Sequence, residues 1–189
     1  TYVMGERGAK NEIATPADVS AMAAIVKEGI ESGAIGFTTS RTELHTTGGD
    51  QAMPGTYADE AELLGIGKVI GELGGKGIFG LVSDFHNWEQ EMDWMKRLSV
   101  DNNCQINFVL FFREEADWDR VLKQLDYCRQ ANAEGAQLIP HVGARPVNIL
   151  LSWDGTINPF SFHANYGPLS VMSHEDRLAE LQKPEVRAA

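Results

Sequence analysis

The feature that most constrains this chain is a regular alternation between segments with helical periodicity and short apolar segments. In the helical segments, apolar side chains recur every three or four residues, as at Leu63, Ile66 and Ile70, which is the spacing of one helix face. The short segments are rich in β-branched and aromatic residues, which favour strands. The predicted helices cover residues 15–33, 56–75, 87–98 and 118–135, and the predicted strands cover residues 34–37, 77–82, 105–112 and 137–142. The first helix is predicted to start with a cap at Thr15, followed by Pro16 and Asp18, and the third with a cap at Asn87; a last short helix is predicted to start at Ser173.

One helix between successive strands predicts a parallel sheet. The helix carries the chain back to the end of the sheet where the preceding strand began, so the next strand runs in the same direction. Four such units form either half of a (β/α)8 barrel or a small open sheet. We therefore expect a single domain over residues 1–189, with an α/β, partial (β/α)8 TIM-barrel-like fold of about four parallel strands. The first residues from Thr1 resemble neither a signal peptide nor an initiator region, so we expect a segment of a longer chain.

The charge balance narrows the range of partners. The chain has 16 Lys and Arg against 27 Asp and Glu, a net charge of −11, and such a chain repels phosphate and anionic lipid. We expect no nucleic-acid partner and no membrane partner. Cys104 and Cys128 do not form a C-x-x-C motif, which favours a reduced, cytoplasmic protein with buried thiols.

Both candidate folds place functional side chains at the carboxyl ends of strands. His141 lies at such an end, where a histidine is either a metal ligand or general base, or is hydrogen-bonded within the loop. Asp84 and His86 follow the second predicted strand and could reach one ligand, although a helix cap is the favoured role for Asp84. The candidate catalytic residues are Asp84 and His141, and the candidate metal ligands are His86 and His141.

Three arginines also lie near predicted strand ends, namely Arg41, Arg113 and Arg145. A guanidinium group binds a carboxylate through two parallel hydrogen bonds, so we predict that these residues bind substrate. Surface ion pairs are the alternative for each of them. The glycine-rich segment 74–77 is not predicted to bind phosphate, because it follows a helix rather than a strand.

A family resemblance begins at residues 33–40, which have the sequence Gly-Ala-Ile-Gly-Phe-Thr-Thr-Ser. A long loop, Pro54, Ala58 and the pair Glu62-Leu63 follow. This order resembles the fourth-strand region of D-aminoacylase-type amidohydrolases, which include N-acyl-D-amino-acid and N-acyl-D-glutamate deacylases. The resemblance covers most of the chain and is strongest over residues 1–75.

The resemblance implies a (β/α)8 barrel in which this chain supplies about strands four to seven. It also implies zinc-dependent hydrolysis of the amide bond of N-acyl-D-amino acids, because zinc lowers the pKa of a bound water and polarises the amide carbonyl. The family's first-strand His-x-His, its bridging cysteine and its last-strand aspartate would lie outside residues 1–189.

Two further metal-binding positions of the family carry no histidine in this sequence. The fifth-strand position has Leu-Val-Ser-Asp at residues 81–84, and the sixth has Ile-Asn-Phe-Val at residues 106–109. Either the parent enzyme uses a reduced metal site, or His86 and His141 replace the missing ligands, or the chemistry has changed. We expect the segment alone to bind zinc weakly or not at all, and to be inactive.

Two other classes of function fit the same pattern. A half-barrel exposes the edges of its outer strands, so the chain could be a non-catalytic α/β module that forms a homo-oligomer. Alternatively, it could belong to a different α/β enzyme that binds a carboxylated or phosphorylated metabolite through the three arginines.

Overall fold

The computed structural model describes residues 1–47, 51–112, 115–146, 150–153, 155, 158–161 and 163–188. Its strands are β1 (Gly36–Arg41), β2 (Ile78–Ser83), β3 (Gln105–Val109) and β4 (Leu138–His141). Its helices are α1 (Glu6–Ala9), α2 (Pro16–Glu31), α3 (Glu60–Glu72), α4 (Trp88–Asn102), the short 3-10 helix η1 (Glu115–Asp117), α5 (Trp118–Ala133), α6 (Gly167–Ser170), α7 (His174–Leu181) and α8 (Pro184–Ala188).

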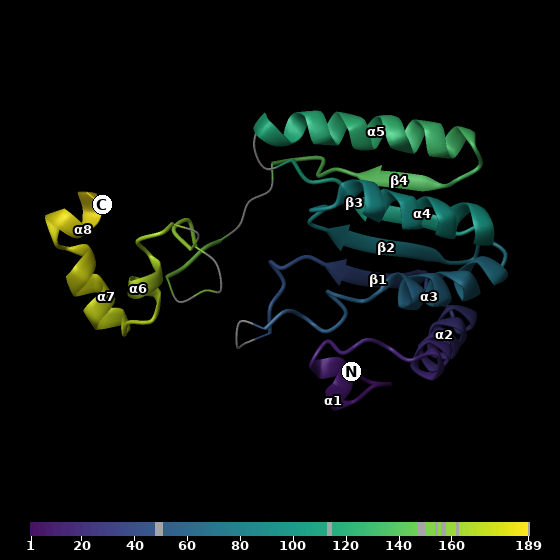
Figure 1. The fold of residues 1–189 in the computed structure, drawn as a ribbon, viewed down its shortest axis with the longest axis horizontal. Helices are drawn as coiled ribbons and strands as arrows, with labels where there is room; N and C mark the ends of the chain where they lie inside the picture. The colour runs from purple at the N-terminus through teal and green to yellow at the C-terminus, as the bar shows by residue number, and fades with distance from the viewer. Residues whose placement is uncertain are drawn as a thin grey trace. The chain divides into compact units, whose positions relative to one another are not determined.

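The chain divides into two units, Thr1–Ala144 and Arg145–Ala189. The first unit contains the sheet, in which the four strands are parallel and follow the order β1-β2-β3-β4 (Figure 1). One α-helix lies between each pair of successive strands in the chain, and the short η1 precedes α5. The predicted partial α/β fold, with parallel strands alternating with helices, is therefore confirmed.

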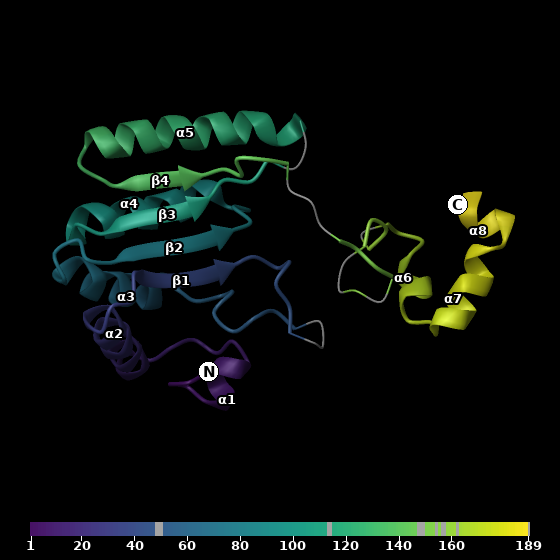
Figure 2. The ribbon, with the colours of Figure 1, turned by 180° about the vertical axis from the view of Figure 1, so that it is seen from behind.

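The helices of the first unit cover one face of the sheet. Helices α3 and α4 lie in front of the strands in Figure 1 and behind them in Figure 2. Phe79 and Phe108 point to this side and are buried together with apolar residues of α2, α3, α4 and α5. Along β2, the alternate residues Ile78, Gly80 and Val82 are only partly buried. Because successive strand residues point to opposite faces, these residues belong to the uncovered face.

Local hydrogen bonds set the starts of the main helices. Thr15 and Asp18 form a reciprocal capping box at the start of α2, and Pro16 occupies its first turn. The side chain of Asn87 accepts from the backbone of Gln90 at the start of α4, as the sequence predicts. Helix α3 begins at Glu60, later than the predicted residue 56, because Asp59 supplies its cap.

The predicted boundaries of the first and third strands are wrong. Strand β1 covers Gly36–Arg41 rather than residues 34–37, and Ile35 is 85% exposed. Pairing begins at Gly36, where a Cβ atom would lie 2.0 Å from the carbonyl oxygen of Ile78, so the close approach requires glycine. Strand β3 ends at Val109 rather than residue 112, because its partner β4 ends at His141.

The second unit contains the predicted short helix after Ser173, whose side chain accepts from the backbone of Asp176. Arg177 is 8% exposed and donates to the carbonyl oxygens of Trp153, Leu169 and Met172. This arginine therefore ties three parts of the unit together. In the described part of the chain, none of the helices has the length and apolar character needed to cross a membrane.

Candidate active site

The carboxyl ends of the four parallel strands meet at one edge of the first unit, because parallel strands share their direction. This edge brings Asp84 and His86, which follow β2, to the same side of the sheet as His141, the last residue of β4. Strand β3 lies between them. The expected shared edge is thus observed, while the chemical roles of these residues stay predictions.

Asp84 is held by the loop that follows β1. Its carboxylate accepts from the hydroxyl of Thr42 and from the backbone N–H of Glu43, both at 2.7 Å. Its side chain is 7% exposed. The favoured interpretation of Asp84 as the cap of the next helix is wrong, because Asn87 caps α4. Asp84 instead joins the end of β2 to the loop that follows β1, through hydrogen bonds to Thr42 and Glu43.

His86 is close to Asp84 but faces solvent. Its Nε2 lies 3.9 Å from Oδ2 of Asp84, and its side chain is 73% exposed. Two small hollows, of about 140 Å³ and about 180 Å³, share a wall made of Ser83, Asp84, Phe85 and His86. The pair therefore lies between two spaces large enough for water or a small polar group.

Arg41 lies at the end of β1 but is already bound to a carboxylate of the protein. Its Nε and Nη2 donate to Glu91 at 2.8–3.2 Å, and Nη1 donates to the carbonyl oxygen of Ala58 at 2.7 Å. Ser83 also donates to Glu91, at 3.1 Å. The guanidinium lies 6.0 Å from the centre of the Trp94 ring. A substrate-binding role for Arg41 stays a prediction, but it would require breaking this ion pair.

Glu91 was missed by the sequence analysis, although the sequence contains a signal for it. Glu91 lies one helical turn from Trp88 and from Met95, both on the apolar stripe of α4. A carboxylate on such a stripe needs a buried cationic partner. The sequence does not show which arginine supplies it.

His141 closes β4 and lies on the uncovered face. Its register partner is Val109, and its backbone oxygen accepts from the N–H of Leu110 at 2.9 Å. Leu138 is buried in the core while Ile139 and His141 are exposed, as the alternation of strand residues requires. The imidazole is thus accessible from the side of the sheet that the helices leave open.

For the other two predicted substrate-binding residues, the role in substrate binding stays a prediction. Arg113 lies outside the described residues. Arg145 is exposed and belongs to the second unit. Within the described ranges, no three His, Cys, Asp or Glu side chains are grouped closely enough to hold a metal ion. A metal site built from His86 and His141 therefore lacks a third ligand among these residues.

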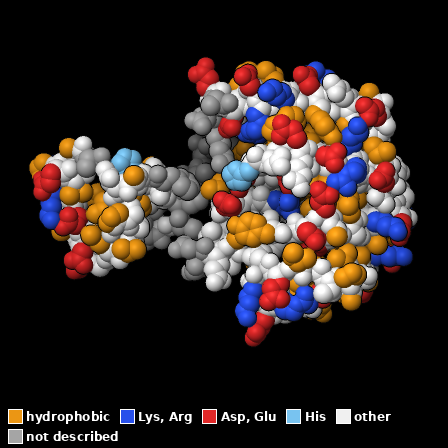
Figure 3. Space-filling model, in the orientation of Figure 1, with side chains coloured by type: hydrophobic (Ala, Val, Ile, Leu, Met, Phe, Trp, Pro, Cys, Tyr) orange, Lys and Arg blue, Asp and Glu red, His pale blue; other side chains and the backbone are white. Residues whose placement is uncertain are grey.

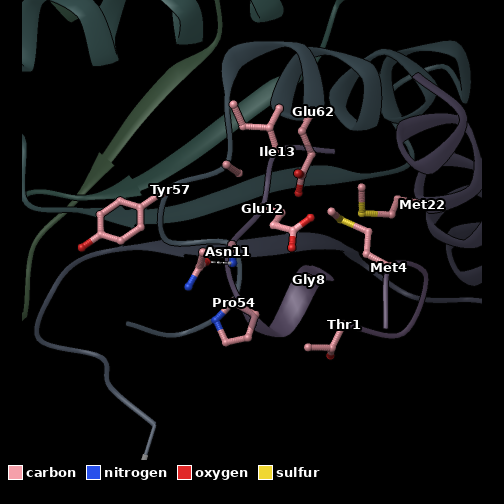
Figure 4. A pocket seen from close by; sticks show the side chains of 12 residues that line it. Thr1, Met4, Gly8, Asn11, Glu12, Ile13, Met22, Pro54, Tyr57 and Glu62 are labelled. Atoms are coloured by element: carbon pink, nitrogen blue, oxygen red, sulfur yellow. Dashed lines mark hydrogen bonds between the residues drawn. The ribbon is translucent and has the colours of Figure 1, made fainter. Parts of the chain in front are cut away.

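A different hollow lies near the start of the chain, between α1, α2 and α3. Figure 4 shows the carboxyl groups of Glu12 and Glu62 pointing toward each other across it. Burial raises the pKa of the Glu62 carboxyl, and the nearby negative charge of Asp59 adds to the rise.

On the helix-covered face, acidic and basic side chains are interspersed (Figure 3).

Solved structures with a similar fold are D-aminoacylase and an N-acyl-D-glutamate deacylase. One is D-aminoacylase, described with a binuclear metal centre, at a TM-score of 0.58 and 17% identity over 74% of this chain and 27% of that chain. Another is N-acyl-D-glutamate deacylase from Bordetella bronchiseptica, in complex with zinc and a phosphonate inhibitor, at a TM-score of 0.52 and 18% identity over 72% of this chain and 27% of that chain.

A third solved structure, again of D-aminoacylase, is described as defining a subset of amidohydrolases. It has a TM-score of 0.55 and 16% identity over 74% of this chain and 27% of that chain. The resemblance to D-aminoacylase-type amidohydrolases is thus confirmed in the fold. This chain spans about a quarter of the length of these enzymes. No family model matches the sequence, and no curated protein does.

Proposed function

We propose that this chain is part of the (β/α)8 barrel of an amidohydrolase that hydrolyses the amide bond of N-acyl-D-amino acids. The observation that carries the proposal is the order β1-β2-β3-β4, with the described helices that connect the strands on one face of the sheet. A doubly wound sheet reverses its strand order and has helices on both faces, whereas a barrel keeps the order and places its helices outside. The likeness to the D-amino-acid deacylases supports the same assignment.

In this proposal the uncovered face of the sheet lines the interior of the barrel. Its side chains are small or polar at several positions, including Thr38, Gly80 and Asn107. Such residues leave room for the side chains of the strands that would complete the ring. His141 would then lie at the rim where barrel enzymes bind their substrates.

The described residues of this chain do not provide a set of ligands that fits zinc. Val82 and Val109, on the uncovered face near the ends of β2 and β3, have no donor atoms in their side chains. We therefore derive no catalytic step through a metal. We assign substrate positioning to this chain, with His141 donating or accepting a hydrogen bond at the rim through a ring nitrogen. A cytoplasmic location is part of the same proposal.

The test uses the full-length protein that contains this chain. N-acetylated amino acids of both configurations are supplied, and amine release is measured with and without a chelator. We expect hydrolysis of the D-amides that the chelator abolishes, and a fall of about 10-fold or more when His141 is replaced by phenylalanine, which cannot form this hydrogen bond. Arg129→Gln, on the exposed side of α5, is the matched control and should keep full activity.

Two results separate the parts of this proposal. Absence of amide hydrolysis by the folded full-length protein would remove the assigned activity. Unchanged hydrolysis by His141→Phe would leave the activity but remove the role of His141.

The open outer edges of β1 and β4 favour a second candidate, a module that pairs with a copy of itself. Each of these strands has one strand partner in the described sheet, and an unpaired strand edge can bind another chain. Sedimentation of residues 1–189 over a range of concentrations tests this. A monomer at every concentration would exclude such pairing.

A further inference from the structure

The second unit contains a hollow of about 480 Å³, which is larger than the hollows beside Asp84. This volume lies within the range of about 300–1,000 Å³ that is usual for small-molecule sites. The hollow lies wholly within the second unit, whose residues begin at Arg145. The described residues that line it are Trp153, Phe160, His163, Asn165, Tyr166, Leu169, Leu181, Val186 and Arg187.

Aromatic rings form one wall of this hollow. The rings of Trp153 and Phe160 are stacked, with centroids 5.4 Å apart and planes inclined by 2°. Tyr166 lies against Trp153 at 5.7 Å. Trp153 is 38% exposed and Phe160 is 48% exposed, although both are large apolar side chains. Partly exposed aromatic side chains beside a hollow are suited to contact with another ring.

Hydrogen bonds from the buried side chains of Arg177 and Asn158 fix the position of this wall. The guanidinium of Arg177 donates to the carbonyl oxygen of Trp153 at 2.7 Å and to that of Leu169 at 3.1 Å. The side-chain amide of Asn158, which is 6% exposed, donates to the hydroxyl of Tyr166 at 2.9 Å. A wall fixed in this way loses little conformational freedom when a ligand binds, which favours affinity.

The polar groups around the hollow favour an anion. Arg187 is exposed, and its guanidinium has no partner among the described residues. Nδ1 of His163 accepts from the backbone N–H of Asn165 at 3.3 Å, so the proton of the neutral ring is on Nε2, which can donate. The lining residues named above include no carboxylate. Two donors beside apolar rings are complementary to a carboxylate attached to an aromatic group.

We propose that this hollow is a binding site for a small aromatic carboxylate. The ring of the ligand packs against the stacked pair of Trp153 and Phe160, and its carboxylate accepts hydrogen bonds from Arg187 and His163. The site is defined by the second unit alone, so it does not depend on the amide hydrolysis proposed for the first unit.

The test is calorimetric titration of the full-length protein with naphthylacetate and with its neutral amide. We expect saturable binding of the acid with a Kd below about 1 mM, as ligand efficiency allows for a molecule of this size. The amide should bind about 10-fold more weakly or worse, since it cannot form charge-assisted hydrogen bonds. Arg187→Gln and His163→Asn should each weaken binding of the acid, the first by about 10-fold to 100-fold.

The controls make each outcome decisive. Arg129→Gln removes an exposed cation from the first unit and should leave the affinity unchanged. Circular dichroism checks that the variants of the second unit stay folded, and His163→Asn replaces Arg187→Gln if the latter loses helix. The proposal is overturned if the acid does not saturate, if acid and amide bind equally, or if the folded variants bind as the unaltered protein does.

Discussion

Replacing Arg41 by methionine should destabilise the first unit, because it leaves Glu91 buried without its cation. The side chains of Arg41 and Glu91 are 17% and 13% exposed. The substitution removes every hydrogen bond between Arg41 and Glu91 and leaves that carboxylate with Ser83. Removing one partner of a fully buried ion pair costs about 3–5 kcal/mol, and an exposed pair contributes about 1 kcal/mol or less. For this nearly buried pair we expect about 3 kcal/mol.

A loss of about 3 kcal/mol corresponds to a fall in Tm of roughly 6–12 °C for a protein of this size. The measurement is urea unfolding of the unaltered protein, Arg41→Met, Glu91→Gln and the double variant. A double-mutant cycle then isolates the interaction between the two side chains. Arg41→Lys should recover little of the loss, because an ammonium group does not match the two parallel bonds of the guanidinium.

The matched control is Arg129→Met, which breaks an exposed pair with Asp126. It should leave the unfolding midpoint nearly unchanged. A coupling energy below about 0.5 kcal/mol between Arg41 and Glu91 would refute the reasoning, because the pair would then behave as a surface ion pair. Breaking the ion pair so that Arg41 can bind a substrate would then cost little free energy.

Three further predictions concern ionisation and packing. Burial raises the pKa of Glu62, so ionisation of this carboxyl as the pH rises destabilises the fold. Glu62→Gln should therefore raise Tm at about pH 7.5 but not at about pH 4. An equal gain in Tm at both pH values would contradict this. Burial raises the pKa of both cysteines to about 11, so a thiol reagent at about pH 8 should label them only after unfolding. Gly71→Ala should cost about 1–3 kcal/mol in denaturant unfolding, because its Cβ would lie 1.8 Å from the Asn102 carbonyl oxygen. The control Gly29→Ala, in open space within α2, should be neutral or stabilising, and equal effects would contradict the packing argument.

The sequence predicted the elements whose signals are local. Thr15, Pro16 and Asp18 lie within one helical turn, and they form the start of α2 as predicted. Asn87 likewise caps α4. The parallel order of the strands follows from the helix between each pair. These features depend on periodicity and on hydrogen bonds between near neighbours, both of which are visible in a sequence.

The start of β1 required information from distant residues. The predicted strand at residues 34–37 follows the local apolar pattern, but pairing begins at Gly36 because the backbone of Ile78 approaches there. That contact joins residues that are far apart in the chain. No local pattern determines where two strands begin to pair.

The partners of the polar residues at the strand ends were decided by the tertiary structure. Asp84, His86 and His141 were correctly predicted to lie at one edge of the sheet, since that follows from the alternation of helices and strands. Whether a carboxylate such as Asp84 caps a helix or fastens a loop depends on which strand lies beside it. The register that pairs Arg41 with Ser83 brings both side chains to Glu91, and it brings Thr42 to Asp84. The sequence by itself determined the sheet and the edge where its strands end. The register between strands decided which side chains meet there, because register is a property of paired segments and not of either segment alone.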